Sequence, residues 1–220
     1  MDVIMGGRLA SWLQVLQRQR QMRKLRDPAF RFLLDAPPPG EWVALDCETT
    51  GLNVRTDEIV SIGAVRIVGN RILTSEPLEL LIRPQGEMRP ESICVHRLRN
   101  RDLDSGVSIE QAIHALLHFI GSRPLVGYYL EFDVAMLNRV VVPMLGIGLP
   151  QPKIEVSALY YDYQFEQLPP YRQQGDPDLD LRFATVMKEL DLPTWDAHDA
   201  LNDAVMAALA FVKLRQLGAA

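Results

Sequence analysis

The sequence predicts an α/β protein in which a mixed β-sheet is flanked by helices and preceded by a helical extension. Segments with strand-like patterns come first, between residues 41 and 82, and are joined by short links. Helix-like and strand-like segments then alternate to about residue 217, an order typical of a mixed sheet covered by helices. A chain of 220 residues is long enough for one such domain and an extension. We expect residues 1–40 to form the extension and residues 41–220 the domain.

The extension combines an apolar helical pattern with a basic run. We expect its apolar side chains to pack on the chain's own core, with a partner-binding helix as the alternative. The run Arg18–Arg26 is basic and helix-forming, which indicates a solvated face or, alternatively, a contact to phosphates or to an acidic partner. Pro37–Gly40 then stops any helix. The apolar residues are Leu9, Trp12, Leu13 and Leu16, followed by Phe30, Phe32, Leu33 and Leu34.

Charge and composition limit the classes of protein to which this chain can belong. The net charge of −5 argues against nucleic-acid binding over the whole surface, although a local site stays open. Residues 1–40 carry a net charge of +4 and the remainder −9. The two cysteines, Cys47 and Cys94, lack metal-ligand spacing and fit a reducing compartment. No secretory signal pattern and no bilayer-length apolar stretch occur, so we expect a cytoplasmic protein with no membrane partner.

The first half of the domain has the residue patterns of neighbouring strands. Val43–Glu48 is an apolar run, and Glu58–Val68 alternates in the manner of a second strand. Gly69 and Asn70 then indicate a hairpin turn. Arg71–Leu73 together with Pro77–Ile82 predicts the third strand, so the three form an antiparallel meander.

The second half alternates helices with short strands. Ser108 is the expected N-cap of a helix that has Glu110 in its first turn. Residues Gln164–Asp178 are rich in proline, glutamine and acids and indicate a surface loop. The predicted helices are Ser108–Ile120, Phe132–Leu145, Leu179–Leu190 and Asp199–Leu217, and the predicted strands are Pro124–Gly127 and Lys153–Val156.

Two carboxylates interrupt the first strand. Side chains alternate between the faces of a strand, so Asp46 and Glu48 point the same way and Cys47 points the other way. Two carboxylates this close both stay ionised at low cost only when a cation lies between them. A Thr-Thr-Gly turn follows, which puts the pair at a strand end where ligands reach it. The alternative is a strand that leaves the core with two solvated acids.

Two further places hold acids in apolar surroundings. Asp133 begins an apolar helix directly after a strand, where complementing the helix dipole is the structural explanation. Asp199 is the expected N-cap of the last helix, which puts Asp203 one turn inside it, where burial requires a partner. His198 precedes this helix, and a capping or surface role is the alternative to a catalytic one.

In chain order these places read Asp-x-Glu-Thr-Thr-Gly, Phe-Asp and His-x-x-x-x-Asp. The pattern extends over Val43–Leu214 and resembles the DEDDh superfamily of 3′-to-5′ exonucleases, the family of the proofreading subunit of bacterial replicative DNA polymerase. The resemblance implies a ribonuclease H-like fold, two bound Mg²⁺ or Mn²⁺ ions and His198 as general base. The implied metal ligands are Asp46, Glu48, Asp133 and Asp203, and the implied contacts to the 3′-terminal nucleotide are Thr49, Thr50 and Leu52.

The residue types suit phosphodiester hydrolysis. That reaction needs an activated water and neutralisation of charge on the attacking and leaving oxygens, which two hard cations provide. Hard cations prefer oxygen ligands, which explains carboxylates in these places. A neutral imidazole near physiological pH can accept the proton of the water, as the role of His198 requires.

The chain departs from the family pattern just before Asp133. Relatives commonly have His-Asn there, whereas this chain has Tyr128 and Tyr129, so the contacts made by relatives are not carried over. Tyr129 is included among the candidate substrate-binding residues because its ring can stack on a base. The alternative for both rings is packing beneath the site. Tyr160, Tyr161 and Tyr163 are expected to be core or rim residues.

The resemblance implies removal of nucleotides from the 3′ end of single-stranded DNA, in proofreading or repair. A DNA polymerase or another replication or repair protein is then an expected partner of the N-terminal helix. RNA is an alternative substrate because the motifs serve both nucleic acids. A non-catalytic docking scaffold is a second alternative, which the intact acids and histidine disfavour. A glycosidase-type pair is disfavoured because carboxylates on one strand face cannot readily flank a sugar bond.

Overall fold

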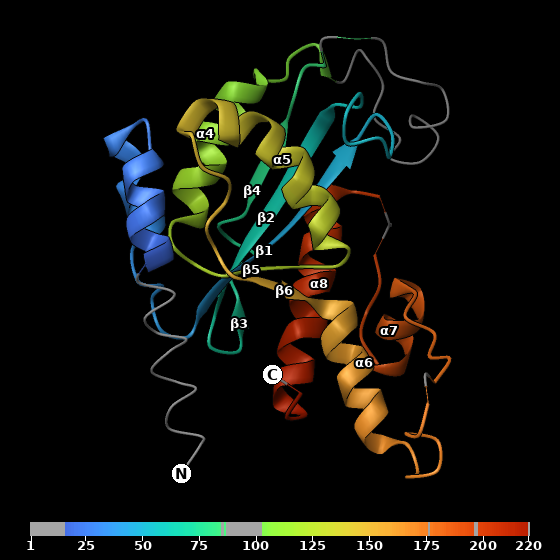
Figure 1. Cartoon of the computed structure of the whole chain (residues 1–220). Helices are drawn as coiled ribbons and strands as arrows, with labels where there is room; N and C mark the ends of the chain where they lie inside the picture. Colours follow the sequence, from blue (N-terminus) through green and yellow to red (C-terminus); the bar gives the residue numbers. More distant parts are fainter. Residues whose placement is uncertain (1–15, 85, 87–102, 176, 196–197, 220) are drawn as a thin grey trace.

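The computed structural model describes residues 16–84, 86, 103–175, 177–195 and 198–219. Within these residues a mixed six-stranded sheet is flanked by helices, which confirms the predicted fold class (Figure 1). The strand order is β3-β2-β1-β5-β6, with β4 also paired to β2. The strands are β1 (Glu41–Thr49), β2 (Ile59–Val68), β3 (Arg71–Ile72), β4 (Leu78–Leu81), β5 (Leu125–Gly127) and β6 (Lys153–Glu155).

Strand β1 lies at the centre of the sheet and connects its antiparallel and parallel parts. It pairs antiparallel with β2 and parallel with β5, which in turn pairs parallel with β6. Val68 pairs with Arg71, so the predicted hairpin turn is confirmed. Because β1 and β5 run parallel, their carboxyl ends lie at the same edge of the sheet.

The prediction of a single third strand was wrong. The segment forms two short strands that both pair with β2, β3 at one end of it and β4 nearer the other. A turn between them, closed by the N–H of Glu76 on the carbonyl of Leu73, takes the chain out of the sheet. Pro77 follows this turn and lacks the N–H that continued pairing would use.

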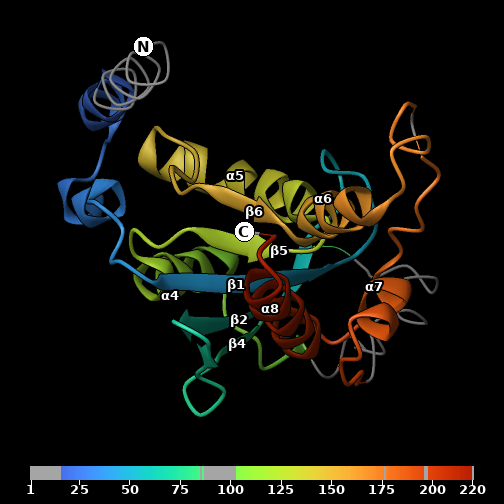
Figure 2. The same cartoon turned by 90° about the horizontal axis from the view of Figure 1, so that it is seen from below.

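Two helical layers cover opposite faces of the sheet. Val43 and Leu45 pack with α4 and α5 in one cluster, whereas Ala44 packs with α8, α6 and α7 in another. In the view of Figure 2, α8 lies against β1 and β2, the strands with which it makes most of its contacts. The helices are α4 (Ile109–Ile120), α5 (Leu130–Leu145), α6 (Val156–Gln167), α7 (Phe183–Glu189) and α8 (Ala200–Gln216).

Most helix predictions are confirmed, with one omission. Ser108 caps α4 and Asp199 caps α8 through their side chains, as expected from the sequence. Helix α7 is shorter than predicted, and α6 was not predicted at all. The apolar side chains of α6 do not form one stripe, so it lacks the periodicity by which amphipathic helices are recognised. Among the described helices, none is both long and apolar enough to cross a membrane.

The extension is partly integrated into the core. Residues 16–24 are helical and mostly exposed, and a 3₁₀ helix, η1 (Pro28–Leu34), follows. Phe30, Leu33 and Leu34 are buried in the cluster that contains α4 and α5, as predicted for this apolar group. Of the first apolar group, Leu9, Trp12 and Leu13 lie outside the described residues, and Leu16 is exposed, so its predicted packing on the core was wrong.

Gly63 allows α8 to approach the sheet beside the acid-bearing end of β1. It pairs with Asp46, and a Cβ atom added to it would lie 2.2 Å from the backbone of Ala200 and Leu201. Such a contact is far inside van der Waals distance, so only glycine fits here without displacing the helix. The close packing of the first turn of α8 thus places Asp203 near β1.

We predict that Gly63→Ala destabilises the fold by about 1–3 kcal/mol, the usual cost of overpacking, because the start of α8 must move away from β2. Urea denaturation of the two proteins measures this difference. Gly175→Ala is the matched control, since its added Cβ meets nothing within 4 Å. A free energy of unfolding unchanged by Gly63→Ala would contradict this account of how α8 is seated.

Candidate active site

The predicted site residues come together in one pocket at the carboxyl end of β1. The pocket has a volume of about 940 Å³ and is formed by the end of β1, the turn after it, the starts of α5 and α8, and α7. Ligand sites of open α/β sheets commonly lie beyond the carboxyl ends of the strands. The predicted residues that line it are Asp46, Glu48, Thr49, Thr50, Leu52, Tyr129, Asp133, His198 and Asp203.

Strand periodicity sets the direction of the first two acids. Ala44 packs against the α8 layer, so Asp46 and Glu48, at steps of two, share its face. Val43, Leu45 and Cys47 belong to the cluster on the opposite face. Glu48 is buried with 8% of its surface exposed, and Asp46 is half-buried. The alternative of two solvated acids at a strand exit is therefore excluded.

The third acid reaches the pocket from the first turn of α5. Asp133 is 4% exposed, and its Oδ1 atom accepts a hydrogen bond of 3.2 Å from the backbone N–H of Cys47. That N–H lies on β1 between the two strand acids. Asp133 is thereby fixed against the strand, a position that complementing the helix dipole alone does not require.

Glu155, which the sequence analysis did not single out, fixes the start of α5. Its carboxylate accepts hydrogen bonds from the backbone N–H groups of Tyr129 and Leu130, at 3.0 and 2.9 Å. Tyr129 has a left-handed backbone with φ of 58°, which turns the chain from β5 into the helix. Glu155 also caps α6, so one carboxylate serves two helix N-termini.

The fourth acid lies in the first turn of α8. The Oδ2 atom of Asp203 accepts a hydrogen bond of 2.9 Å from the backbone N–H of His198. The backbone of His198 is left-handed, with φ of 67°. The Oδ1 atom of Asp203 is buried and has no hydrogen-bond partner among the described residues. A buried carboxylate oxygen without a donor is costly unless a ligand satisfies it.

The pKa values of all four acids are raised. Burial is the largest cause in each case, and for Asp46 the charges of Asp133, Asp203 and Glu48 add to it. Burial and the charge of Asp203 raise the pKa of Glu48 to about 7. Burial raises the pKa of Asp133 to about 8, although the hydrogen bond from Cys47 works in the opposite direction. Burial also raises the pKa of Asp203.

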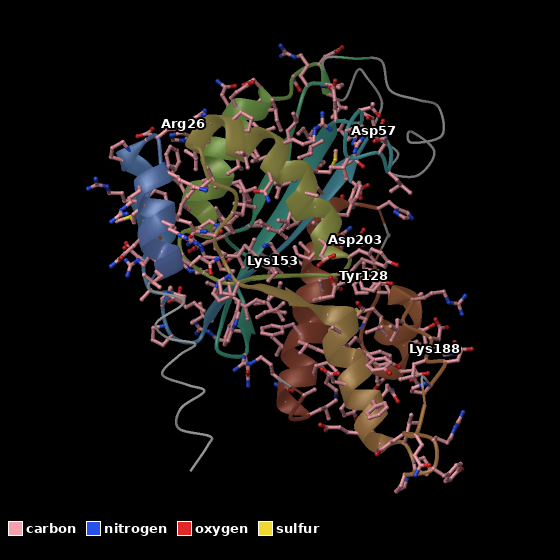
Figure 3. The ribbon with its side chains drawn as sticks, viewed as in Figure 1. Arg26, Asp57, Tyr128, Lys153, Lys188 and Asp203 are labelled. Atoms are coloured by element: carbon pink, nitrogen blue, oxygen red, sulfur yellow. The ribbon has the colours of Figure 1, made fainter. Side chains whose placement is uncertain are left out.

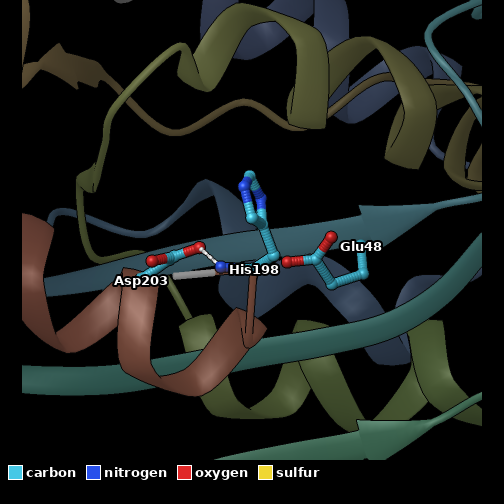
Figure 4. A group of neighbouring side chains, drawn as sticks. All are labelled: Glu48, His198 and Asp203. Atoms are coloured by element: carbon cyan, nitrogen blue, oxygen red, sulfur yellow. Dashed lines mark hydrogen bonds between the residues drawn. The ribbon is translucent and has the colours of Figure 1, made fainter. Parts of the chain in front are cut away.

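This arrangement fits divalent cations. Ligand atoms of Glu48, His198 and Asp203 lie within 4.8 Å of one another (Figure 4). Asp46 and Asp133 line the same pocket. A cation here would neutralise the crowded carboxylates and satisfy the free oxygen of Asp203. Oxygen donors are the ligands that Mg²⁺ and Mn²⁺ prefer, so the donor set suits these ions.

The four predicted substrate-binding residues differ in what their side chains do. The hydroxyl of Thr49 donates to the carbonyl of Gly51 at 2.7 Å, and the hydroxyl oxygen of Thr50 accepts from the N–H of Glu58 at 2.9 Å. These bonds hold the turn after β1. Leu52 and Tyr129 are 86% and 71% exposed, although both line the pocket. They therefore offer free apolar surface, and all four binding roles remain predictions.

Tyr128 lines the pocket, and its ring packs against α7. Its ring stacks on Phe183 of α7 at 4.6 Å between centroids, and its hydroxyl donates to the carbonyl of Leu181 at 3.0 Å. Of the second tyrosine group, Tyr160 is buried and Tyr163 packs against the core, and neither lines the pocket. The residues that the sequence analysis missed come mainly from α7 and the loop before α8; they are Phe132, Phe183, Ala184, Met187, Thr194, Trp195 and Met206.

We predict that the metal-free protein loses stability as the pH rises from about 5 to 8. Raised pKa values mean that the folded state retains protons in this range that the unfolded state has released, so the free energy of unfolding falls with pH. Melting temperatures in EDTA should drop by several degrees, and excess Mg²⁺ should reverse much of the loss at pH 8.

Asp133→Asn should flatten this pH dependence. Asp180→Asn is the control, because Arg182 and Thr185 lower the pKa of the exposed Asp180 carboxyl and keep its titration below this range. A melting temperature in EDTA that rises between pH 5 and 8 would contradict the assigned burial of the acids.

Comparison with known proteins agrees with this geometry. A model of the RNase_T family, described as Exonuclease, matches residues 43–211. The chain is 30% identical to a PolC-type DNA polymerase III of Thermotoga maritima over 87% of this chain, but over only 13% of that protein. It is 27% identical to the DNA polymerase III epsilon subunit of Aquifex aeolicus over 80% of each chain.

The fold is also that of solved exonucleases. Exonuclease X, determined in complex with 5′ overhanging duplex DNA, superposes with a TM-score of 0.60 at 22% identity, over 80% of this chain and 92% of that one. The family match covers all four acids, the histidine and the strand-helix framework that holds them. The resemblance to DEDDh exonucleases is therefore confirmed, and the chain belongs to the RNase_T family of exonucleases.

Proposed function

We propose that this chain removes nucleotides from the 3′ end of single-stranded DNA in a reaction that depends on divalent metal ions. The observation that carries the proposal is the convergence of carboxylates from β1, α5 and α8 in one pocket whose mouth is apolar. Carboxylates alone suit a cation site, and exposed apolar side chains alone suit many ligands. Their combination suits a nucleotide, which has an anionic phosphate and an apolar base.

The acids and the histidine have separate tasks. Two Mg²⁺ or Mn²⁺ ions held by the four acids would polarise the phosphodiester and stabilise charge on the attacking and leaving oxygens. His198 lies at the pocket wall with its backbone fixed by Asp203, so a ring nitrogen can accept the proton of the attacking water. Asp203 thus both completes the acid set and positions the general base.

The turn after β1 and the start of α5 would hold the terminal nucleotide. Thr49 and Thr50 stabilise the turn through their hydroxyls, which presents Leu52 at the pocket mouth. Leu52 and Tyr129 offer exposed apolar surface to a base. A base contacts these side chains only when it is unpaired, which favours a single-stranded end. The Exonuclease X structure with DNA supports DNA as the substrate.

We predict that Asp46→Asn, Asp133→Asn and Asp203→Asn abolish cleavage, because each removes a charge that a cation requires. His198→Ala should lower the rate by about 10²–10⁴-fold, the usual contribution of a general base. The measurement is a gel time course on 5′-labelled single-stranded DNA and on RNA of the same sequence, with Mg²⁺, Mn²⁺ or EDTA.

The control for the acid variants is Asp180→Asn, which removes a carboxylate outside the pocket and should retain activity. Shortening from the 5′ end, or full activity in any of the three acid variants, would reject the proposal. If the RNA is degraded faster than the DNA, RNA and not DNA is the substrate.

We also propose that the extension binds a replication polymerase in the cytoplasm. Support comes from the exposed helix over residues 16–24, which carries Arg18, Arg20, Arg23 and Lys24, and from the polymerase III relatives. The following segment contacts the end of α5, where the N–H of Arg26 donates to the carbonyl of Leu145 at 2.8 Å. Arg26 lies well away from Asp203, so a partner on this side leaves the pocket open (Figure 3).

Removal of residues 1–24 should therefore abolish co-elution with the polymerase from the same organism while nuclease activity remains. Deletion beyond this point would expose the core around Phe30 and Leu33 and confuse the test. Size-exclusion chromatography of the mixed proteins provides the measurement. Undiminished co-elution of the shortened chain would place the contact elsewhere.

A further inference from the structure

Exposed apolar side chains gather at the mouth of the pocket. Large hydrophobic side chains that remain exposed are scattered over the described surface, yet Leu52, Tyr129 and Trp195 all line this pocket. Single exposed apolar residues are ordinary on a protein surface, whereas a group around a cavity indicates a ligand. Leu52 and Tyr129 already have proposed contacts to the terminal nucleotide. Trp195 has none.

Trp195 reaches the pocket from the layer opposite to that of Tyr129. Tyr129 begins α5, which covers one face of the sheet, and Trp195 lies in the loop between α7 and α8, which cover the other face. The pocket lies between these layers at the end of β1. A ligand that enters the pocket can therefore be contacted by side chains of both segments.

The surroundings of Trp195 are suited to a base. Phe183 and Met187 of α7 and Met206 of α8 line the same pocket, so the indole shares it with further apolar side chains. Trp195 is 47% exposed, which leaves surface of this large residue free for a ligand. It also lies three residues before His198, and a base on the indole would therefore bring its nucleotide near the general base.

We propose that Trp195 stacks on the base of the 3′-terminal nucleotide and makes cleavage depend on that base. The inference rests on the proposed function and adds a specificity-determining residue to it. Stacking on an aromatic ring tolerates every base, so Trp195 favours an intact, unpaired base without selecting among sequences. A 3′ end that lacks its base should be a poor substrate.

The test compares two 5′-labelled oligothymidylates, one ending in thymidine and the other in a tetrahydrofuran nucleotide without a base. The wild-type chain should favour the normal end in kcat/KM by roughly 5- to 150-fold, the range that one stacked base contributes. Trp195→Ala should lower this preference by slowing cleavage of the normal end alone, with the contacts of Leu52 and Tyr129 retained, and Trp195→Phe should keep the wild-type preference.

Tyr171→Ala is the matched control, since Tyr171 is an exposed aromatic residue that does not line the pocket. It should leave both substrates unaffected. If Trp195→Ala lowers kcat/KM equally for the two oligonucleotides, Trp195 only supports the loop before α8, and the proposal is overturned. An unchanged preference in Trp195→Ala would overturn it as well.

A binding measurement separates this proposal from the nuclease activity. With Ca²⁺ in place of Mg²⁺, titration of the normal oligothymidylate should quench tryptophan fluorescence in the wild-type chain more than in Trp195→Phe, which retains Trp12 and Trp42. The oligonucleotide without the terminal base should not produce this difference. Quenching without cleavage in Mg²⁺ would reject the proposed function and leave the stacking contact supported, whereas cleavage without Trp195-dependent quenching would reject the stacking contact alone.

Discussion

Repulsion among carboxylates is the constraint on which the rest of this site depends. Asp46, Glu48, Asp133 and Asp203 share one pocket, and burial raises the pKa of each. Such a cluster destabilises the fold at neutral pH unless protons or cations compensate its charge. At pH values above these raised pKa values the folded protein is thus less stable than it would be with apolar residues in these places, and binding of a cation recovers that free energy.

The scaffold holds the acids together by backbone contacts that are independent of cations. The N–H of Cys47 holds Asp133 against β1, and the N–H of His198 holds Asp203 at the start of α8. Gly63 admits α8 close to the sheet, and Glu155 fixes the turn before α5. Apart from the bond between His198 and Asp203, these contacts join segments far apart in sequence, so the site forms only with the complete sheet and both helical layers.

The sequence predicted what depends on local periodicity and motif. Strand alternation was enough to place Asp46 and Glu48 on one face, and the capping residues located α4 and α8. It did not predict α6, whose apolar residues form no stripe, nor the division of the third strand, which depends on the turn between Leu73 and Glu76. The pocket residues of α7 and Trp195 were not predicted from the sequence for a different reason. Their place in the pocket follows from the packing of α7 beside α8, which no local pattern records.

The most direct test of the account is the number of Mn²⁺ ions that the chain binds near pH 8, measured by calorimetry with electron paramagnetic resonance. Two bound ions per chain are predicted, with at least one lost in Asp203→Asn, because that variant removes the buried oxygen that lacks a partner. Asp180→Asn should bind as the wild-type chain does. Absence of Mn²⁺ binding, or binding that Asp203→Asn leaves unchanged, would contradict the claim that these four acids form a cation site.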